Sequence, residues 1–131
     1  MERITVEELH SRFKAQGVSG RKDIAVKCPM CGTVQSMRSL IEAGAGETED
    51  AVEKFVGFSC VGRFTNAGPY KKGSKPGLGC DWTLGGLFQI HNTEVVTPEG
   101  KVHRYFEVAS PEEAQSLAAT FAIARAEDSH V

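Results

Sequence analysis

The feature that most constrains this chain is a pair of cysteines, Cys28 and Cys31, in the run Cys-Pro-Met-Cys-Gly. Two thiolates at this spacing can bind one tetrahedral metal ion while the backbone between them turns tightly. Gly32 lets the chain leave that turn without a Cβ clash, and its amide can point back at a sulfur. Because two thiolates alone rarely hold a structural metal ion, the motif requires two further ligands elsewhere in the chain.

The other two cysteines of the chain are the natural candidates for those ligands. Gly62 lies two residues after Cys60, and Gly79 directly precedes Cys80, so both sites have backbone suited to a ligand turn. We therefore predict a structural zinc ion, Zn2+, held by Cys28, Cys31, Cys60 and Cys80. Zn–S bonds of about 2.3 Å would bring the four sulfurs within about 4 Å of one another. Such a closed site leaves no open coordination position, which argues against zinc catalysis.

Three other interpretations of the cysteines stay open. Cys60 and Cys80 can be small buried apolar residues without a metal. Alternatively, zinc can be held by three cysteines together with His91 or His103. The first cysteine pair can also be a redox pair, although the expected βαβ context is missing.

The composition and the helix signals indicate one α+β domain that spans residues 1–131. The chain is 40% hydrophobic and 24% charged, which is typical of a globular protein. Thr5 with Glu8, and Ser110 with Glu113, have the spacing of capping boxes that start an N-terminal and a C-terminal helix. Between them, we expect a short strand over 24–27, short helices over 37–43 and 48–55, and β-structure over 87–108. The predicted fold is therefore a small zinc-stabilised α+β domain with a β-hairpin or antiparallel sheet and flanking terminal helices.

The predicted hairpin turns at residues 97–100 and is expected to pack against the C-terminal helix. In its second strand Val102, Phe106 and Val108 alternate with polar residues, so we expect them to share one face. Two registers are possible, and they place Glu94 opposite either His103 or Arg104. Either pairing would contribute roughly 0.2–1 kcal/mol.

The charge balance and the apolar pattern exclude several classes of protein. With 15 Lys and Arg against 17 Asp and Glu, the formal net charge of −2 excludes a strongly basic chromatin-type binder and a polyanionic nucleic-acid mimic. No apolar run reaches the roughly 18 residues of a transmembrane helix, and the N-terminus lacks signal-peptide features. We expect a cytoplasmic protein without a membrane partner.

The segment 61–79 carries no acidic residue, and its part 65–79, which is rich in glycine and proline, is expected to be a long exposed loop. Its candidate partner-binding residues are Arg63, Tyr70, Lys71, Lys72 and Lys75. Such a loop can run along a nucleic-acid backbone and stack on bases, or dock on an acidic protein surface. Equally, its charges can serve only to keep a solvated loop soluble. The one tryptophan, Trp82, is expected to be a core residue next to the metal, with base stacking as the alternative.

Four stretches of the chain together resemble a family of small cysteine-containing, zinc-ribbon-like proteins from phage and prophage genomes. They are the runs 28–35, 56–63, 79–88 and 100–107. The resemblance implies an accessory protein that acts inside a bacterial host, and it carries no catalytic residues. The sequence has no Walker motif, no Ser-His-Asp arrangement and no H-E-x-x-H motif, so it gives no positive support for an enzyme.

Two functions from different classes follow from these observations. In the first, the protein binds a host protein or defence complex and blocks or redirects its activity, which the near-neutral charge favours. In the second, it is a zinc-ribbon nucleic-acid-binding protein in phage gene expression or replication, which the basic segment favours. Neither the partner nor the oligomeric state follows from the sequence.

Overall fold

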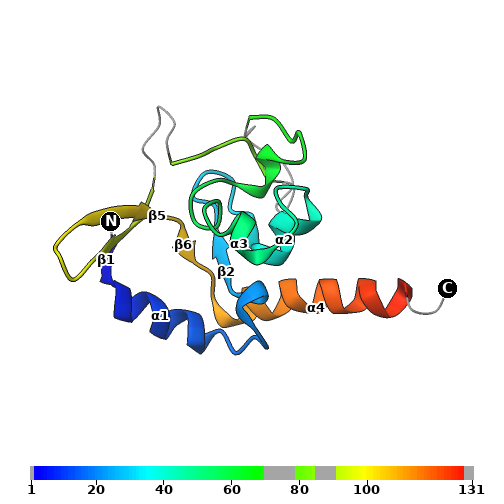
Figure 1. Ribbon diagram of the computed structural model, residues 1–131, viewed down its shortest axis with the longest axis horizontal. Coiled ribbons are helices and arrows are strands. Elements are labelled where there is room, and N and C mark those ends of the chain that lie inside the picture. Colours follow the sequence, from blue (N-terminus) through cyan, green and yellow to red (C-terminus); the bar gives the residue numbers. More distant parts are fainter. Residues whose placement is uncertain (1, 70–78, 85–90, 129–131) are drawn as a thin grey trace.

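The computed structural model describes residues 2–69, 79–84 and 91–128, with the backbone alone for 123–128. The elements run in the order β1 (Glu2–Thr5), α1 (Val6–Ala15), η1 (Arg21–Asp23), β2 (Ala25–Lys27), β3 (Val34–Ser36), α2 (Met37–Glu42), α3 (Glu49–Val52), η2 (Val61–Arg63), β4 (Thr93–Val96), β5 (Val102–Tyr105), β6 (Glu107–Val108) and α4 (Pro111–Asp128). The molecule is a small α+β fold with helices at both ends of the chain, as the sequence predicts (Figure 1). Among the helices of the described ranges, none is long and apolar enough to cross a bilayer.

The first sheet has the order β1-β4-β5, with β1 parallel to β4 and β5 antiparallel to it. Ile4 pairs with Val95, and both are buried against Leu9 of α1. The strand β1 was not expected from the sequence, because its partner lies about ninety residues further along the chain and no turn signal joins the two. Its apolar contact nevertheless makes the hydrophobic staple that the spacing of Ile4 and Leu9 indicates.

The second sheet, β3-β2-β6, is antiparallel and carries α4 on one side. Small buried residues at the contact, among them Ala25 and Ala114, let the helix approach the sheet closely. The fully buried Gln16 joins the end of α1 to this sheet. Its side-chain amide donates to the carbonyls of Ala25 and Ala109, at 2.8 and 3.0 Å, and accepts the Ala25 N–H at 2.9 Å. One amide side chain therefore satisfies three backbone groups in the core.

The helix caps follow the sequence pattern closely. Reciprocal capping boxes form between Thr5 and Glu8 and between Ser110 and Glu113. Hydroxyl caps also start α2 and α3, but α3 ends at Val52, before the predicted limit near residue 55. Of the predicted β-run 87–108, the described strands cover 93–96, 102–105 and 107–108, and residues 85–90 lie outside the description.

Two expectations for the hairpin are wrong, and one of the two alternatives for its register is confirmed. Helix α4 packs on β2, β3 and η1 and not on the hairpin, which α1 covers at β4. Val102 is 47% exposed whereas Phe106 is fully buried, because β5 and β6 belong to different sheets and the chain leaves the first sheet at Phe106. The register places Glu94 opposite Arg104, as one alternative predicts, but the carboxylate pairs with Arg3 of β1 at 2.8 Å instead.

Candidate metal centre

The first pair of cysteines lies in the turn between β2 and β3. The Cys28 N–H donates to the Thr33 carbonyl at 2.9 Å and closes the hairpin. Gly32 has a φ of 75°, the left-handed conformation expected for the exit from this turn. Its amide, however, donates to the carbonyl of Cys28 at 2.8 Å and not to a sulfur. The turn is therefore built as predicted, with a different partner for the glycine amide.

The second pair of cysteines comes from two segments that lie antiparallel to each other. The Cys60 N–H donates to the Trp82 carbonyl at 3.0 Å, and the Leu84 N–H donates to the Phe58 carbonyl at 2.9 Å. This short ladder places Cys60 at the end of one segment and Cys80 at the start of the other. We call the hairpin of β2 and β3, residues 25–36, the first arm. The two segments 58–62 and 79–84 together are the second arm.

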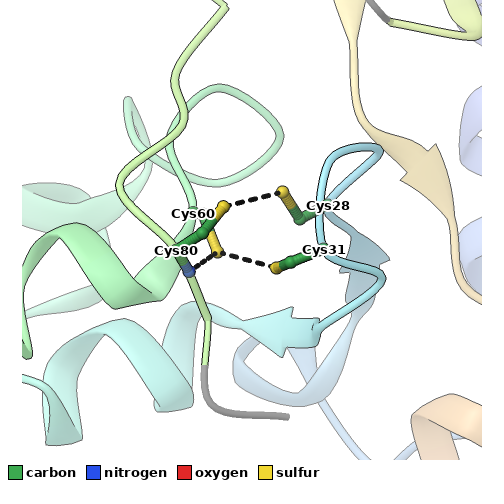
Figure 2. A group of neighbouring side chains, drawn as sticks. All are labelled: Cys28, Cys31, Cys60 and Cys80. Carbon is green, nitrogen blue, oxygen red and sulfur yellow. Dashed lines mark hydrogen bonds between the residues drawn. The ribbon is translucent and has the colours of Figure 1, made fainter. Parts of the chain in front are cut away.

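The four sulfurs point into one small space between the two arms (Figure 2). The Sγ atoms of Cys28 and Cys80 are 3.9 Å apart, and those of Cys31 and Cys60 are 3.7 Å apart. All four lie within 4.8 Å of one another, so these two pairs meet the expected spacing of about 4 Å and the group as a whole is slightly wider. Four cysteines in this arrangement could hold a metal ion.

The cluster is part of the main hydrophobic core. Cys28, Cys60 and Cys80 are buried, whereas Cys31 keeps partial contact with solvent. Trp82 is 7% exposed, and its ring lies 5.7 Å from that of Phe106, centroid to centroid. The prediction that this tryptophan is a core residue beside the cysteines is therefore confirmed.

Backbone N–H groups next to the cysteines favour the ionised form of their sulfurs. The N–H of Cys80 donates to the sulfur of Cys60 at 3.3 Å. The N–H groups of residues 31, 33, 62 and 82 act to lower the pKa of the thiols of Cys28, Cys31, Cys60 and Cys80, respectively, against burial, which raises it. Because hydrogen bonds to an ionised group are roughly twice as strong as neutral ones, the bond from Cys80 stabilises Cys60 more as a thiolate than as a thiol.

Without a metal ion, the four thiols cannot all ionise. The pKa of Cys31 is lowered because the thiols of Cys28 and Cys60 hydrogen-bond to its sulfur, and the pKa of Cys28 is raised by the same contact with Cys31. Burial raises the pKa of Cys80 to about 12. A bound cation reverses this balance, because a coordinating thiol is deprotonated outright.

Two side chains of the first arm bind the backbone of the second arm. The amide of Gln35, which is fully buried, donates to the Ser59 carbonyl at 2.9 Å and accepts the Val61 N–H at 2.6 Å. The hydroxyl of Thr33 accepts the Gly79 N–H at 3.0 Å. These contacts hold the residues on both sides of Cys60 and the residue before Cys80. The sequence analysis missed both side chains, because nothing in a single sequence pairs them with segments so far along the chain.

The two segments of the second arm meet backbone to backbone at Gly62 and Gly79. A Cβ added to Gly62 would lie 2.6 Å from the carbonyl carbon of Gly79, and one added to Gly79 would lie 2.7 Å from the Gly62 Cα. Gly79 also has a φ of 81°. Both glycines therefore bring the two ligand segments together, which gives a physical reason for the glycines that flank Cys60 and Cys80.

The histidines of the hairpin lie outside the cluster. His91 Nε2 is 3.3 Å from a carboxylate oxygen of Glu94, and His103 is exposed on β5. Neither belongs to the group of potential metal ligands in the described part of the chain. The structure therefore brings together four cysteines, and not three cysteines with a histidine.

The predicted partner-binding residues divide into one that is described and four that are not. Arg63 is exposed, and its guanidinium donates to the Asp81 carbonyl at 2.7 Å. The Asp81 N–H in turn donates to the Gly68 carbonyl at 2.9 Å. These bonds close the base of the basic segment. The remaining candidates, Tyr70, Lys71, Lys72 and Lys75, lie outside the described residues.

Comparison with known proteins gives one family match. The model of the family described as VVA0879-like matches residues 5–109. This span includes α1, both arms and the strands β2 to β6, and it leaves out α4 and all of β1 except Thr5. No curated protein and no solved structure matches the chain. Because the match covers well over half of the sequence, the chain belongs to the VVA0879-like family.

Proposed function

We propose that the four-cysteine cluster holds a structural zinc ion. The observation that carries the proposal is the convergence of four cysteine sulfurs, all within 4.8 Å of one another, because this is the arrangement that one tetrahedral ion requires. Four thiolates in a closed, largely buried group are a typical ligand set for structural zinc. A bound ion would cross-link the two arms. Its four thiolate ligands would leave no open coordination position for a substrate.

Metal analysis of the purified chain tests this proposal. We expect one zinc ion per chain and four thiols that resist alkylation until a chelator removes the metal. Titration with cobalt(II) adds the ligand identity, because thiolate-to-metal charge transfer reports sulfur ligands. A chain that is folded, metal-free and unable to take up zinc or cobalt would contradict the proposal.

For the protein as a whole, we propose the role of a phage-type accessory protein in the cytoplasm of a bacterial host. It binds a host protein or defence complex and blocks or redirects its activity. The resemblance to phage and prophage proteins supports the setting, and the net charge of −2 favours a protein partner over a nucleic acid. A closed metal site is consistent with a binding protein, since it offers no position for catalysis.

The second candidate function is a zinc-ribbon nucleic-acid-binding protein in phage gene expression or replication. The segment 61–79 favours it, because Arg63 and three lysines stand there with two aromatic residues and no acid. Phosphate contacts release counterions, so such binding weakens steeply as salt rises.

Two experiments separate these candidates. Affinity capture from host lysate, with the metal-loaded chain as bait, is expected to retain a protein partner after nuclease treatment. A salt titration with generic DNA and RNA is expected to show no binding even at low salt. Steep salt-dependent binding of either nucleic acid, with loss of captured protein after nuclease, would favour the second function instead.

A further inference from the structure

The outer edge of β5 is an open strand edge with a net positive charge. In the hairpin, the Thr97 N–H donates to the Lys101 carbonyl, so hydrogen-bonded pairs toward β4 recur at His103 and Tyr105. The backbone N–H and C=O groups of Val102 and Arg104 therefore face away from β4. They have no hydrogen-bond partner in the described residues.

The next outward-facing N–H along this edge, that of Phe106, already has a hydrogen-bond partner. The Phe106 N–H, which has the same orientation as those of Val102 and Arg104, donates to the Gly57 carbonyl at 3.1 Å. Gly57 thus occupies the edge position at Phe106, and the two positions at Val102 and Arg104 stay open among the described residues. The edge is a strand-addition site of the kind that binds extended peptides.

The side chains around the open edge define the chemistry of a partner. Lys101, His103 and Arg104 are all exposed, and none of them forms an ion pair within the described part of the chain, although Arg104 lies opposite Glu94. Two large apolar side chains that are exposed, Val102 at 47% and Phe58 at 45%, also belong to this region: Val102 is on the edge itself, and Phe58 directly follows Gly57. An extended segment with acidic and apolar residues complements both features.

A second copy of the chain is the less suitable occupant. Pairing of β5 with another β5 would bring Lys101 and Arg104 of one chain near those of the other, and like charges close together on paired strands are destabilising. Basic residues on an edge strand protect against such self-association. The same charges attract an acidic strand.

We propose that the outer edge of β5 docks an extended acidic segment of a partner protein by β-strand addition. This inference rests on the proposed function only in so far as both concern a protein partner, since the edge lies outside the metal cluster and the basic segment. The main-chain groups of Val102 and Arg104 supply the hydrogen bonds. The cations Lys101 and Arg104 supply selectivity for acidic residues, and Val102 and Phe58 supply apolar contacts.

The test uses a blocked, labelled peptide of alternating glutamate and valine residues and the full metal-loaded chain. We expect saturable binding with amide chemical-shift changes confined to residues 101–106 and 57–58. A peptide of the same sequence with alternate backbone nitrogens methylated keeps its charge but cannot form the strand ladder, and we expect its binding to be lost. Equal binding of both peptides would overturn strand addition.

Charge variants test the selectivity. Lys101→Glu with Arg104→Glu is expected to weaken peptide binding by at least about tenfold, because it reverses the charges that meet the acidic side chains. Lys14→Glu with Lys22→Glu makes the same change in net charge at sites of α1 and η1 that form no ion pair, and serves as the matched control. Equal weakening in both variants would reduce the effect to net charge and contradict the assignment. Val102→Pro, which removes one outward N–H at an edge position that tolerates proline, is a second variant with the charges intact.

The outcomes separate this inference from the proposed function. If the peptide fails to bind while the chain still captures a protein from lysate, the edge assignment falls and the proposed function stands. If the peptide binds at the edge while capture fails, the edge assignment stands alone. Displacement of the peptide by single-stranded RNA, with the methylated peptide binding equally well, would assign the cations to nucleic acid and overturn the proposal.

Discussion

The two arms around the cysteines and the sheet β1-β4-β5 are held together by different kinds of contact. The sheet is joined by strand ladders and by a small apolar cluster of Ile4, Leu9 and Val95. The arms have only short ladders, and to the hydrophobic core around Trp82 and Phe106 they add one sulfur cluster, side-chain-to-backbone hydrogen bonds and one close approach of two glycines. If the proposed zinc ion is bound, the arms depend on it in addition to packing, whereas the sheet depends on strand pairing and packing alone.

The largest effect is expected from loss of a metal ligand. Cys28→Ser should abolish stoichiometric zinc binding and unfold the arms, because metal binding free energy in such sites is about 10–16 kcal/mol and is coupled to folding. In hydrogen exchange, we expect amides of 28–36, 58–64 and 80–84 to lose protection, while β4 and β5 retain most of theirs. The chelated wild-type chain should behave in the same way.

Two results would contradict the expected difference in protection between the arms and the sheet. Uniform loss of protection across both regions would mean that the domain unfolds as one cooperative unit, with Phe13 and Tyr105, which pack against both core clusters, coupling the halves. An unchanged melting temperature in the metal-free serine variant would mean that the arms hold together without the ion.

The next largest effect is expected at the contact between the two ligand segments. In Gly62→Ala, the new methyl group meets backbone atoms of residues 79 and 80, which cannot move aside as a flexible side chain can. We expect a loss of about 3 kcal/mol in the free energy of unfolding, at the upper end for overpacking, together with weaker zinc binding. The control is Gly20→Ala, since Gly20 has a φ of −166° and no atom within 4 Å of an added Cβ. Equal melting temperatures of the two variants would show that the fold tolerates separation of the two segments of the second arm.

A matched pair of glutamines sharpens the comparison between the regions. Gln35 and Gln16 are both fully buried, and each satisfies backbone groups with its amide, Gln35 between the arms and Gln16 between α1 and the second sheet. Replacement of either by leucine leaves buried backbone groups unpaired, and we expect a loss of about 2 kcal/mol in each case. Only Gln35→Leu should also weaken zinc affinity, measured by competition with a chelator. A similar loss of zinc affinity in Gln16→Leu would show that zinc affinity depends on the stability of the whole fold and not on the contact between the arms.

The sequence predicts best those features whose signals are local. The capping boxes at Thr5 and Ser110 and the turn of Cys28 to Gly32 each lie within a few residues, and each is found where expected. The convergence of Cys60 and Cys80 on the first pair could also be predicted, because the chemistry of zinc requires four ligands and the chain has only four cysteines.

The features that the sequence analysis missed depend on contacts between distant segments. Strand β1 exists because β4 offers it a parallel partner, and Gln35 and Thr33 acquire their roles only when the second arm is folded against them. The predicted common face of Val102 and Phe106 failed for a similar reason. Alternation along one strand was extrapolated across a point at which the chain passes from one sheet to the other.

The smallest effect on stability is expected in the basic segment 61–79. There we expect substitutions to change partner binding and not folding. Replacement of Lys71, Lys72 and Lys75 together by alanine should leave the melting temperature almost unchanged, because exposed charges typically contribute about 0–1 kcal/mol. Partner capture should weaken, since lysines that meet an anionic partner contribute to encounter and register. Zinc content should stay at the wild-type value, because the base of the segment is closed by Arg63, Gly68 and Asp81 and by the cysteines themselves.

A thermal melt, a zinc measurement and a capture experiment on the same triple variant make this prediction specific. A lowered melting temperature would assign the lysines to the fold. Undiminished capture would show that the charges of the segment are merely solvated, and binding would then have to be sought on the rest of the surface. Loss of capture in the triple variant together with loss in Lys101→Glu with Arg104→Glu would indicate one partner that contacts both regions, because one set of lysines belongs to the segment 61–79 and the other two cations belong to β5 and the turn before it.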